Sequence, residues 1–315
     1  MKTRKTKYGY TIISAMLLIL LVLLPVFISS ESYSLIFLAN ILMYVVLTVS
    51  WAIFSGPTGY ISLATSAFFG VGVYSTALFS DALPLAVVIL IGGLGSFCLA
   101  YLVGSVTLRL RGMYFTMFTF ALVELIRNLV HWYEVNITGT VGRMVTTPES
   151  ITIYYGMVII FLAVLLASYL IKRSKYGLAL QGIGESEDAA AHTGINVTRV
   201  KTVMFAVSAF FMGLTGAAMS LRWSYVDPTM AFDISRSFMP VLMAIFGGMG
   251  HLYAPIAGAS IFSILEELFT TKFPYYYMLL FGLTMLLVIR FMPLGIEGVI
   301  ERLRRRNKLV VTEKS

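Results

Sequence analysis

The strongest constraint on this chain is its succession of apolar runs, each continuous over many residues and nearly free of charge. The hydrocarbon core of a bilayer is about 30 Å thick, and a helix needs roughly 20 apolar residues to cross it. Hydrophobic residues make up 58% of the sequence and charged residues only 12%, against about 45–50% and about 25% in soluble domains. The runs lack the alternation typical of membrane β-barrel strands. The sequence therefore predicts an all-α, polytopic transmembrane helical bundle.

About ten membrane segments are predicted within a transmembrane domain at 10–296, between an N-terminal segment at 1–9 and a basic tail at 297–315. Their predicted ranges are 10–28, 34–54, 60–80, 84–108, 113–130, 153–171, 201–221, 236–250, 252–270 and 275–291. The first run is long and no clear cleavage site follows it, which favours an uncleaved span over a signal peptide. The segment at 236–250 is short and rich in glycine, as a broken or re-entrant segment would be.

The basic residues predict the orientation of the chain. With the N-terminus in the cytoplasm, 18 of the 23 lysines and arginines fall on the cytoplasmic side, as the positive-inside rule requires. Both termini and the loop at 172–201 are therefore predicted to be cytoplasmic. The net charge of +8 is explained by this placement and by attraction to anionic membrane lipid, so no nucleic-acid partner is expected.

The loop at 172–201 is the most polar long segment of the chain. Its centre, Glu185 to Thr193, is compatible with a short helix, because acidic residues suit a helix N-terminus. Gly194 suits the left-handed position just past a helix end. We expect a short helix outside the membrane, on which a partner docks.

Sequence motifs for enzyme chemistry are absent. The phosphate-binding pattern G-x-x-x-x-G-K-[ST] does not occur, and no arrangement of catalytic carboxylates or of a Ser-His-Asp triad stands out. Three scattered histidines and the single Cys98, which is expected to be buried, make no metal cluster and exclude an intrachain disulfide. Neither an enzyme nor a cofactor is predicted.

Candidate residues for a solute path are few. Glu124 and Arg127 are spaced to meet on one helix face, either as a mutually neutralising pair or as a polar contact for solute. Gly56, Gly59 and Ser62, and then Gly247 and Gly248, belong to two segments rich in small residues. Such residues serve close helix packing, or they break helices whose freed backbone groups face a cavity.

Taken in order, several motifs resemble those of the permease subunits of ABC importers for branched-chain amino acids, in particular the LivM-type subunit. The stretches that carry the resemblance are GPTGYISL at 56–63, AFFGVGVY at 67–74, RGMYFTM at 111–117, the loop at 172–201, GGMG at 247–250 with Pro255 and Gly258-Ala259, and PLGI at 293–296. Together they span most of the chain.

The resemblance implies that the loop at 172–201 contains the coupling helix, which docks on an ATP-binding subunit. Its residues here are Glu185, Glu187, Asp188, Ala189, Ala190, Gly194 and Ile195, with Lys201 matching a basic residue at the entry to the next span. Three positions depart from the family pattern, namely Gly184, Asp188 and Thr193, and they bear on the contacts with the cognate ATPase.

The resemblance further implies a bacterial cytoplasmic-membrane complex of this chain with a second, LivH-like permease, two ATP-binding cassette subunits and an extracytoplasmic solute-binding protein. That protein would release solute at the outer loops 131–152 and 222–235. Urea or short amides are alternative solutes. A stand-alone secondary transporter is an alternative of another class, and it predicts ionisable residues deep in the spans, of which Glu124 and Arg127 are almost the only examples. A membrane scaffold or a lipid-modifying enzyme is a further alternative, which would need catalytic residues at the membrane interface or would leave the docking helix without a reason.

Overall fold

The computed structural model describes residues 33–276 apart from residue 252, together with isolated positions at 25, 279, 282, 283, 286, 290, 295 and 298. The predicted segments 1–9, 10–28 and 297–315 lie outside the described residues except at two of these positions, and so does most of the predicted span at 275–291.

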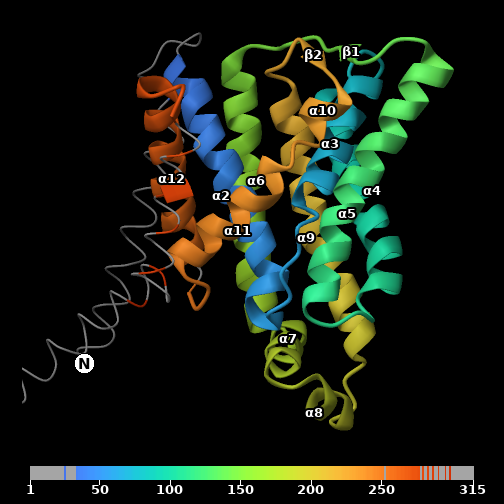
Figure 1. Cartoon of the computed structure of the whole chain (residues 1–315), viewed down its shortest axis with the longest axis vertical. Coiled ribbons are helices and arrows are strands. Elements are labelled where there is room, and N and C mark those ends of the chain that lie inside the picture. Colours follow the sequence, from blue (N-terminus) through green and yellow to red (C-terminus); the bar gives the residue numbers. More distant parts are fainter. Residues whose placement is uncertain are drawn as a thin grey trace, which may run out of the picture.

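The described chain is a bundle of helices that carries a small sheet at one end (Figure 1). Its elements are α2 (Tyr33–Thr58), α3 (Thr65–Phe79), α4 (Leu85–Thr107), α5 (Met113–Tyr133), the π-helix η1 (Glu134–Thr138), β1 (Arg143–Met144), α6 (Ser150–Arg173), α7 (Lys175–Glu185), α8 (Glu187–His192), α9 (Val197–Ser220), β2 (Tyr225–Val226), α10 (Pro228–Ala231), α11 (Ser235–Gly247) and α12 (Tyr253–Lys272).

Within the described residues, six segments are long and apolar enough to cross a membrane, and each overlaps a predicted span. They are Tyr33–Thr58, Leu85–Thr107, Met113–Thr138, Ser150–Arg173, Val197–Ser220 and Pro228–Gly247. The predicted all-α, multi-pass architecture is confirmed. The predicted count of about ten segments is not confirmed, because two of the ten fall largely outside the described residues.

The predicted span at 60–80 is not one continuous helix. Residues 59–64 are non-helical, and α3 begins only at Thr65. With 15 residues, α3 is about 22 Å long at 1.5 Å per residue, which is shorter than the hydrocarbon core. Gly59, at φ +72°, lets the chain leave α2 in a left-handed conformation that other residues rarely adopt.

Helix α9 lies at the centre of the bundle and packs against α2, α3, α4 and α6. Glycines set the spacing between α3 and α9. A β-carbon on Gly72 would lie 2.0 Å from the Gly213 carbonyl oxygen, and one on Gly216 would lie 2.0 Å from the Phe69 carbonyl oxygen. These small residues therefore allow α3 and α9 to pack closely.

Helices α11 and α12 form a tight hairpin. The chain turns at Gly248, which has φ +103°, and returns as α12. A β-carbon on Gly247 would lie 2.1 Å from the Ala254 carbonyl oxygen, so the close approach of the two helices requires glycine there. Helix α11 itself has 13 residues, and together with the preceding α10 it makes up the candidate span Pro228–Gly247.

The two ends of the bundle differ in character (Figure 1). At one end, β1 and β2 pair antiparallel, with Arg143 opposite Val226, so the two predicted outer loops are joined by backbone hydrogen bonds. At the other end, α7 and α8 lie beyond the spans. The outward faces of α4, α5 and α6 carry exposed apolar side chains such as Leu102, Met117 and Leu166, as surfaces that face lipid do. Cys98 on α4 is exposed, so the expectation that it is buried was wrong.

Candidate functional site

The polar loop at 172–201 folds into two helices rather than one. The predicted helical run from Glu185 to Thr193 is divided at Ser186, which is extended at φ −161° and ψ 115° and accepts a hydrogen bond from the Ala189 amide at 3.3 Å. Glu185 therefore ends α7, and α8 begins at Glu187. This boundary corrects the prediction, and its cause is the cap that a serine hydroxyl supplies to a new helix.

Gly194 ends α8 as the sequence predicts. Its φ is +85°, and the turn around it satisfies carbonyl groups of α8 through hydrogen bonds from the Gly194 amide to Ala191 and from the Ile195 amide to Ala190. A left-handed residue at this position is a common helix terminator. Helix α8 is therefore short but defined at both ends by local interactions.

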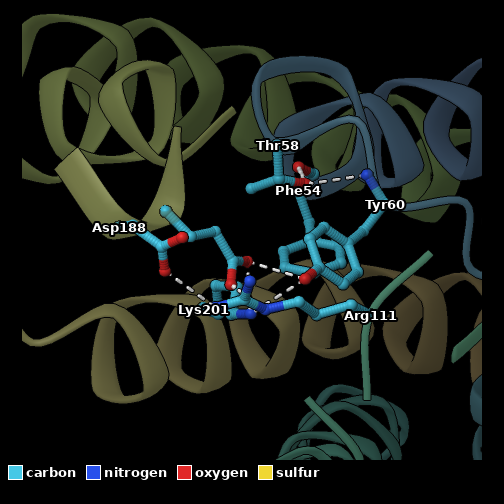
Figure 2. Close-up of polar contacts among 7 residues, drawn as sticks. Phe54, Thr58, Tyr60, Arg111, Asp188 and Lys201 are labelled. Carbon is cyan, nitrogen blue, oxygen red and sulfur yellow. Dashed lines mark hydrogen bonds and ion pairs between the residues drawn. The ribbon is translucent and has the colours of Figure 1, made fainter. Parts of the chain in front are cut away.

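The Glu187 carboxylate binds three other parts of the chain (Figure 2). Oε1 accepts hydrogen bonds from Lys201 Nζ at 2.6 Å and from the Tyr60 hydroxyl at 2.7 Å. Oε2 lies 3.3 Å from Arg111 Nε. Lys201 is in the first turns of α9, Tyr60 follows α2, and Arg111 precedes α5. One side chain thus links α8 to the ends of three helices of the bundle. We call Tyr60, Arg111, Glu187 and Lys201 the anchor cluster.

Lys201 is the buried member of the anchor cluster, with 2% of its side chain exposed, against 15% for Glu187. Its Nζ also donates to the Tyr60 hydroxyl at 3.2 Å and lies 4.4 Å from the centre of the Tyr60 ring. Burying an ammonium group is costly unless it is paired and hydrogen-bonded. The Glu187 carboxylate and the electron-rich face of the ring meet that requirement.

Electrostatics favour the ionised form of Glu187. Burial desolvates the carboxylate and by itself raises its pKa. Hydrogen bonds from Lys201 and Tyr60, together with the charges of Lys201 and Arg111, outweigh that effect and hold the pKa below its usual value. The pKa of Tyr60 is raised by burial and by its hydrogen bond to Glu187. Tyr60 therefore stays protonated and donates to the carboxylate.

A peripheral ion pair extends the anchor cluster. Arg111 Nη2 lies 3.0 Å from Asp188 Oδ1, and both side chains are exposed. Exposed ion pairs contribute little to stability. Asp188 therefore helps to hold α8 in place mainly because it binds the same arginine, Arg111, as Glu187 does.

Beneath the anchor cluster lies a group of aromatic rings. The Tyr60 ring meets Phe115 edge-on, with ring centres 5.4 Å apart, and Phe115 meets Phe205 at 5.9 Å. Phe54 completes the group at 5.2 Å from Phe205. Phe54, Phe115 and Phe205 are fully buried and come from α2, α5 and α9. The cluster is therefore built on the packed core of the bundle.

Helix α7 contacts the end of α2 through Gly184. A β-carbon on Gly184 would lie 2.0 Å from the Pro57 carbonyl oxygen, so the contact requires glycine. Gly184 is one of the departures from the family pattern, and the structure provides this reason for it.

The predicted path residues fall into separate groups. Gly56, Gly59 and Ser62 lie at the α7–α8 end of the bundle. Gly56 faces the turn after Gly248, because a β-carbon added to Gly56 would lie 3.9 Å from that of Met249. A cavity of about 280 Å³ lies there, bounded by α2, α6, α7 and this turn, and Gly56 is the one predicted path residue that lines it.

Ser62 is buried, and its carbonyl oxygen accepts a hydrogen bond from Trp51 Nε1 at 2.8 Å. Glu124 and Arg127 form an ion pair within α5, each with 30% of its side chain exposed. The structure thus confirms that these two residues meet. It does not bring them to Ser62 or to the glycines.

Several cluster residues were not predicted as site residues. Tyr60 and Arg111 lie within the family-like motifs at 56–63 and 111–117, and Lys201 was noted only as a basic residue at a span entry. The signal available in the sequence was a lysine inside a predicted span, which needs a partner. Among the described residues, no group of three or more histidine, cysteine or acidic side chains is placed to hold a metal ion.

Comparison with known proteins places these observations in context. Residues 33–289 match the family model described as "Branched-chain amino acid transport system / permease component". The high-affinity branched-chain amino acid permease LivM of Salmonella typhimurium is 26% identical over 81% of this chain and 68% of its own length. LivM of Escherichia coli is 25% identical over the same shares. The fructose import permease FrcC of Rhizobium meliloti is 30% identical over 43% of this chain and 39% of its own. No solved structure matches the chain significantly.

Proposed function

Because the chain belongs to the family of branched-chain amino acid transport permease components, we propose that it forms half of the translocation path of a bacterial ABC importer. In this proposal ATP is hydrolysed by separate subunits, and this chain is not itself an enzyme. A second, LivH-like permease completes the path, and the LivH relatives support this partner, since LivH of Escherichia coli is 27% identical over 50% of this chain.

The observation that carries the proposal is the anchor cluster. Helix α8 lies outside the spans, and its Glu187 contacts the ends of α2, α5 and α9 within a few ångströms. A displacement of α8 by an ATP-binding subunit would therefore reach three membrane helices through short, charged contacts. Such transmission of movement is what coupling requires, because ATP-driven motion at the cytoplasmic side must open a path within the membrane.

The docking face of α8 follows from the same geometry. Glu187 points into the chain and Ala190 is buried, whereas Ala189, His192 and Gly194 are exposed. We assign the contact with the ATP-binding subunit to the exposed set and a positioning role to Glu187. Asp188 and Glu185, the last residue of α7, are also exposed, and Ile195 is half-buried.

The opposite end of the chain is the proposed receiving surface for the solute-binding protein. The two outer loops are joined by the β1–β2 sheet, and Glu134 accepts hydrogen bonds from Tyr74 and from the Gly142 amide. A surface held in this way provides a defined platform for a partner. With this orientation, both termini and α8 lie in the cytoplasm.

Branched-chain amino acids are the first candidate solute, because the relatives that cover most of the chain transport them by name. Sugars are the second candidate. Relatives named as fructose and ribose import permeases match shorter parts of the chain, over 43% and 32% of its length.

The proposal is tested by purifying the tagged full-length chain from membranes in mild detergent and identifying the accompanying subunits by mass spectrometry. Ala189→Arg, on the exposed face of α8, should abolish recovery of the ATP-binding subunit. Ala82→Arg, at an exposed alanine near the opposite end, is the matched control and should leave recovery unchanged. A chain that purifies alone and moves solute in liposomes without ATP would instead be a secondary transporter. Solute identity is then read from binding of leucine, isoleucine, valine, fructose and ribose to the co-purified binding protein.

A further inference from the structure

A groove of about 400 Å³ lies between α7 and the start of α9, and no residue of the anchor cluster lines it. It is lined by Lys175, Tyr176, Ala179, Ile195, Asn196, Arg199, Val200 and Val203. The lining combines two cationic side chains with an apolar floor. None of its residues has a role in the proposed coupling contact except Ile195, which lies at its edge.

The positive charge of this groove is not balanced within the described part of the chain. Lys175 and Arg199 are exposed, and no carboxylate of the described residues lies within ion-pair distance of either. The first turns of α7 and α9 contain no acidic residue. Lys175 contacts the ring of Tyr176, at 5.9 Å from Nζ to the ring centre. A bound anion would supply the missing countercharge.

The groove lies at the level where the spans meet the membrane surface. Helix α6 ends at Arg173 and α9 begins at Val197, and both are candidate spans. Val203 lies almost two turns inside α9, at about 9 Å along the helix axis from Val197. Two tyrosines lie near this end of the spans: Tyr176 lines the groove, and the Tyr169 ring, in the last turns of α6, lies 4.4 Å from the Arg173 guanidinium carbon. Tyrosines of this kind are typical of the membrane interface.

We propose that this groove binds the head group of an anionic phospholipid. The phosphate group lies against Lys175 and Arg199, and the part of an acyl chain nearest the head group runs along Val200 and Val203. The apolar floor is the reason to choose a phospholipid over free phosphate, since a small inorganic anion would leave that floor in contact with water. Because Lys175 and Arg199 lie on α7 and α9, a bound lipid would bridge the same two helices that the α8 segment connects.

The test uses the full-length chain with its accompanying subunits, reconstituted with equal amounts of phosphatidylglycerol and phosphatidylcholine of the same acyl composition. Lipids retained after extraction are counted by native mass spectrometry. Lys175→Gln and Arg199→Gln should each reduce retention of phosphatidylglycerol about fivefold, as expected for loss of one basic residue at an anionic surface. Retention of phosphatidylcholine should not change. Arg199→Lys, which keeps the charge, should retain phosphatidylglycerol.

Arg109→Gln is the matched control, because Arg109 is an exposed arginine near the same end of the bundle and lines no part of the groove. Equal loss of phosphatidylglycerol in Arg109→Gln would show a general charge effect and overturn the proposal. So would unchanged retention in both groove variants, or displacement of the lipid by inorganic phosphate at constant ionic strength. A photoreactive phenylalanine analogue at position 176 should cross-link to lipid, and cross-linking to an ATP-binding subunit instead would assign the groove to that partner.

Discussion

Lys201 and Glu187 form an ion pair of 2.6 Å in which the lysine is almost wholly buried, although Glu187 belongs to a helix outside the membrane spans. The pair therefore joins the packed interior of the bundle to a surface element of six residues. A short helix has little intrinsic stability in water. Its position here depends on this contact and on the two hydrogen-bonded ends of α8.

Removal of one member of this pair should destabilise the chain more than removal of both. Glu187→Gln leaves the buried Lys201 ammonium without its countercharge, at a cost of about 3 kcal/mol in the free energy of unfolding. The double variant Glu187→Gln/Lys201→Met removes the buried charge and should recover about 1–2 kcal/mol. Thermal unfolding in detergent is measured for four proteins: the wild-type chain, Glu187→Gln, Lys201→Met and the double variant. Additive effects of the two substitutions would show that the pair does not contribute as a unit.

Asp188→Asn is the control for this cycle, because it removes a carboxylate of the same helix that is exposed and bound only to Arg111. Its effect should stay below about 1 kcal/mol. Glu187→Lys is a poor test of coupling, since it would place a second ammonium group against Lys201 and affect folding as well as transport.

The contribution of Glu187 should depend on pH. Its pKa in the folded chain lies below the usual value of 4.5, so its contribution to stability is complete above about pH 4.5 and is lost as the pH falls through the folded pKa. The difference in unfolding temperature between the wild-type chain and Glu187→Gln should therefore be constant between about pH 5 and pH 7 and shrink in more acidic solution. If this difference in unfolding temperature grew on acidification, the folded state would be stabilised by the protonated form of Glu187 rather than by the carboxylate.

Gly194→Ala should impair transport through the position of α8. Alanine at φ +85° is strained by about 1 kcal/mol, and the strain is relieved if the end of α8 unwinds. ATP-driven uptake in proteoliposomes should fall severalfold, while insertion into the membrane is kept. The control is Gly182→Ala in α7, where a β-carbon would meet no atom within 4 Å and φ is not positive. Equal uptake by both variants would contradict a role for the shape of α8.

Gly216→Ala should destabilise the bundle itself. The added β-carbon would lie 2.0 Å from the Phe69 carbonyl oxygen, so α3 and α9 must separate, at a cost of about 1–3 kcal/mol. Gly156→Ala on α6 is the control, since nothing lies within 4 Å of the added carbon. Thermal unfolding should separate the two variants clearly, and similar unfolding temperatures would mean that the helices adjust without loss.

Glu124 and Arg127 offer a test of the solute path. If their side chains contact solute, Glu124→Gln should raise the apparent KM for uptake severalfold, and the double variant Glu124→Gln/Arg127→Gln should not restore it. If the two residues only neutralise each other, the double variant should recover the wild-type KM, because no unpaired charge remains. Uptake kinetics with the solute identified for the binding protein distinguish these outcomes. We expect the second, because the two side chains pair with each other within α5.

Much of the architecture follows from local sequence. The six described spans overlap predicted ranges because a long apolar run depends on nothing beyond its own composition. Gly194 was predicted to end a helix on similar grounds, since a left-handed turn is decided within a few residues. The helix boundary at Ser186 was missed because serine is tolerated both inside a helix and as its cap.

The anchor cluster could not be derived in this way. Tyr60 and Glu187 are 127 residues apart, and Arg111 and Asp188 are 77 residues apart. Glu187 was predicted to belong to a helix that docks on a partner subunit because it matches the family pattern of the coupling helix. Its actual neighbours are set by the packing of α2, α5 and α9 around Phe205, which no local pattern records.

The sequence by itself determined that this chain crosses a membrane several times and carries a polar helical segment outside it, because hydropathy and turn chemistry act over neighbouring residues. Only the tertiary structure decided that Glu187 faces inward to Lys201, that Gly184 and Gly216 let backbones touch, and that Lys175 and Arg199 share one groove. These relationships depend on distances between residues remote in the chain, and such distances exist only once the helices have packed.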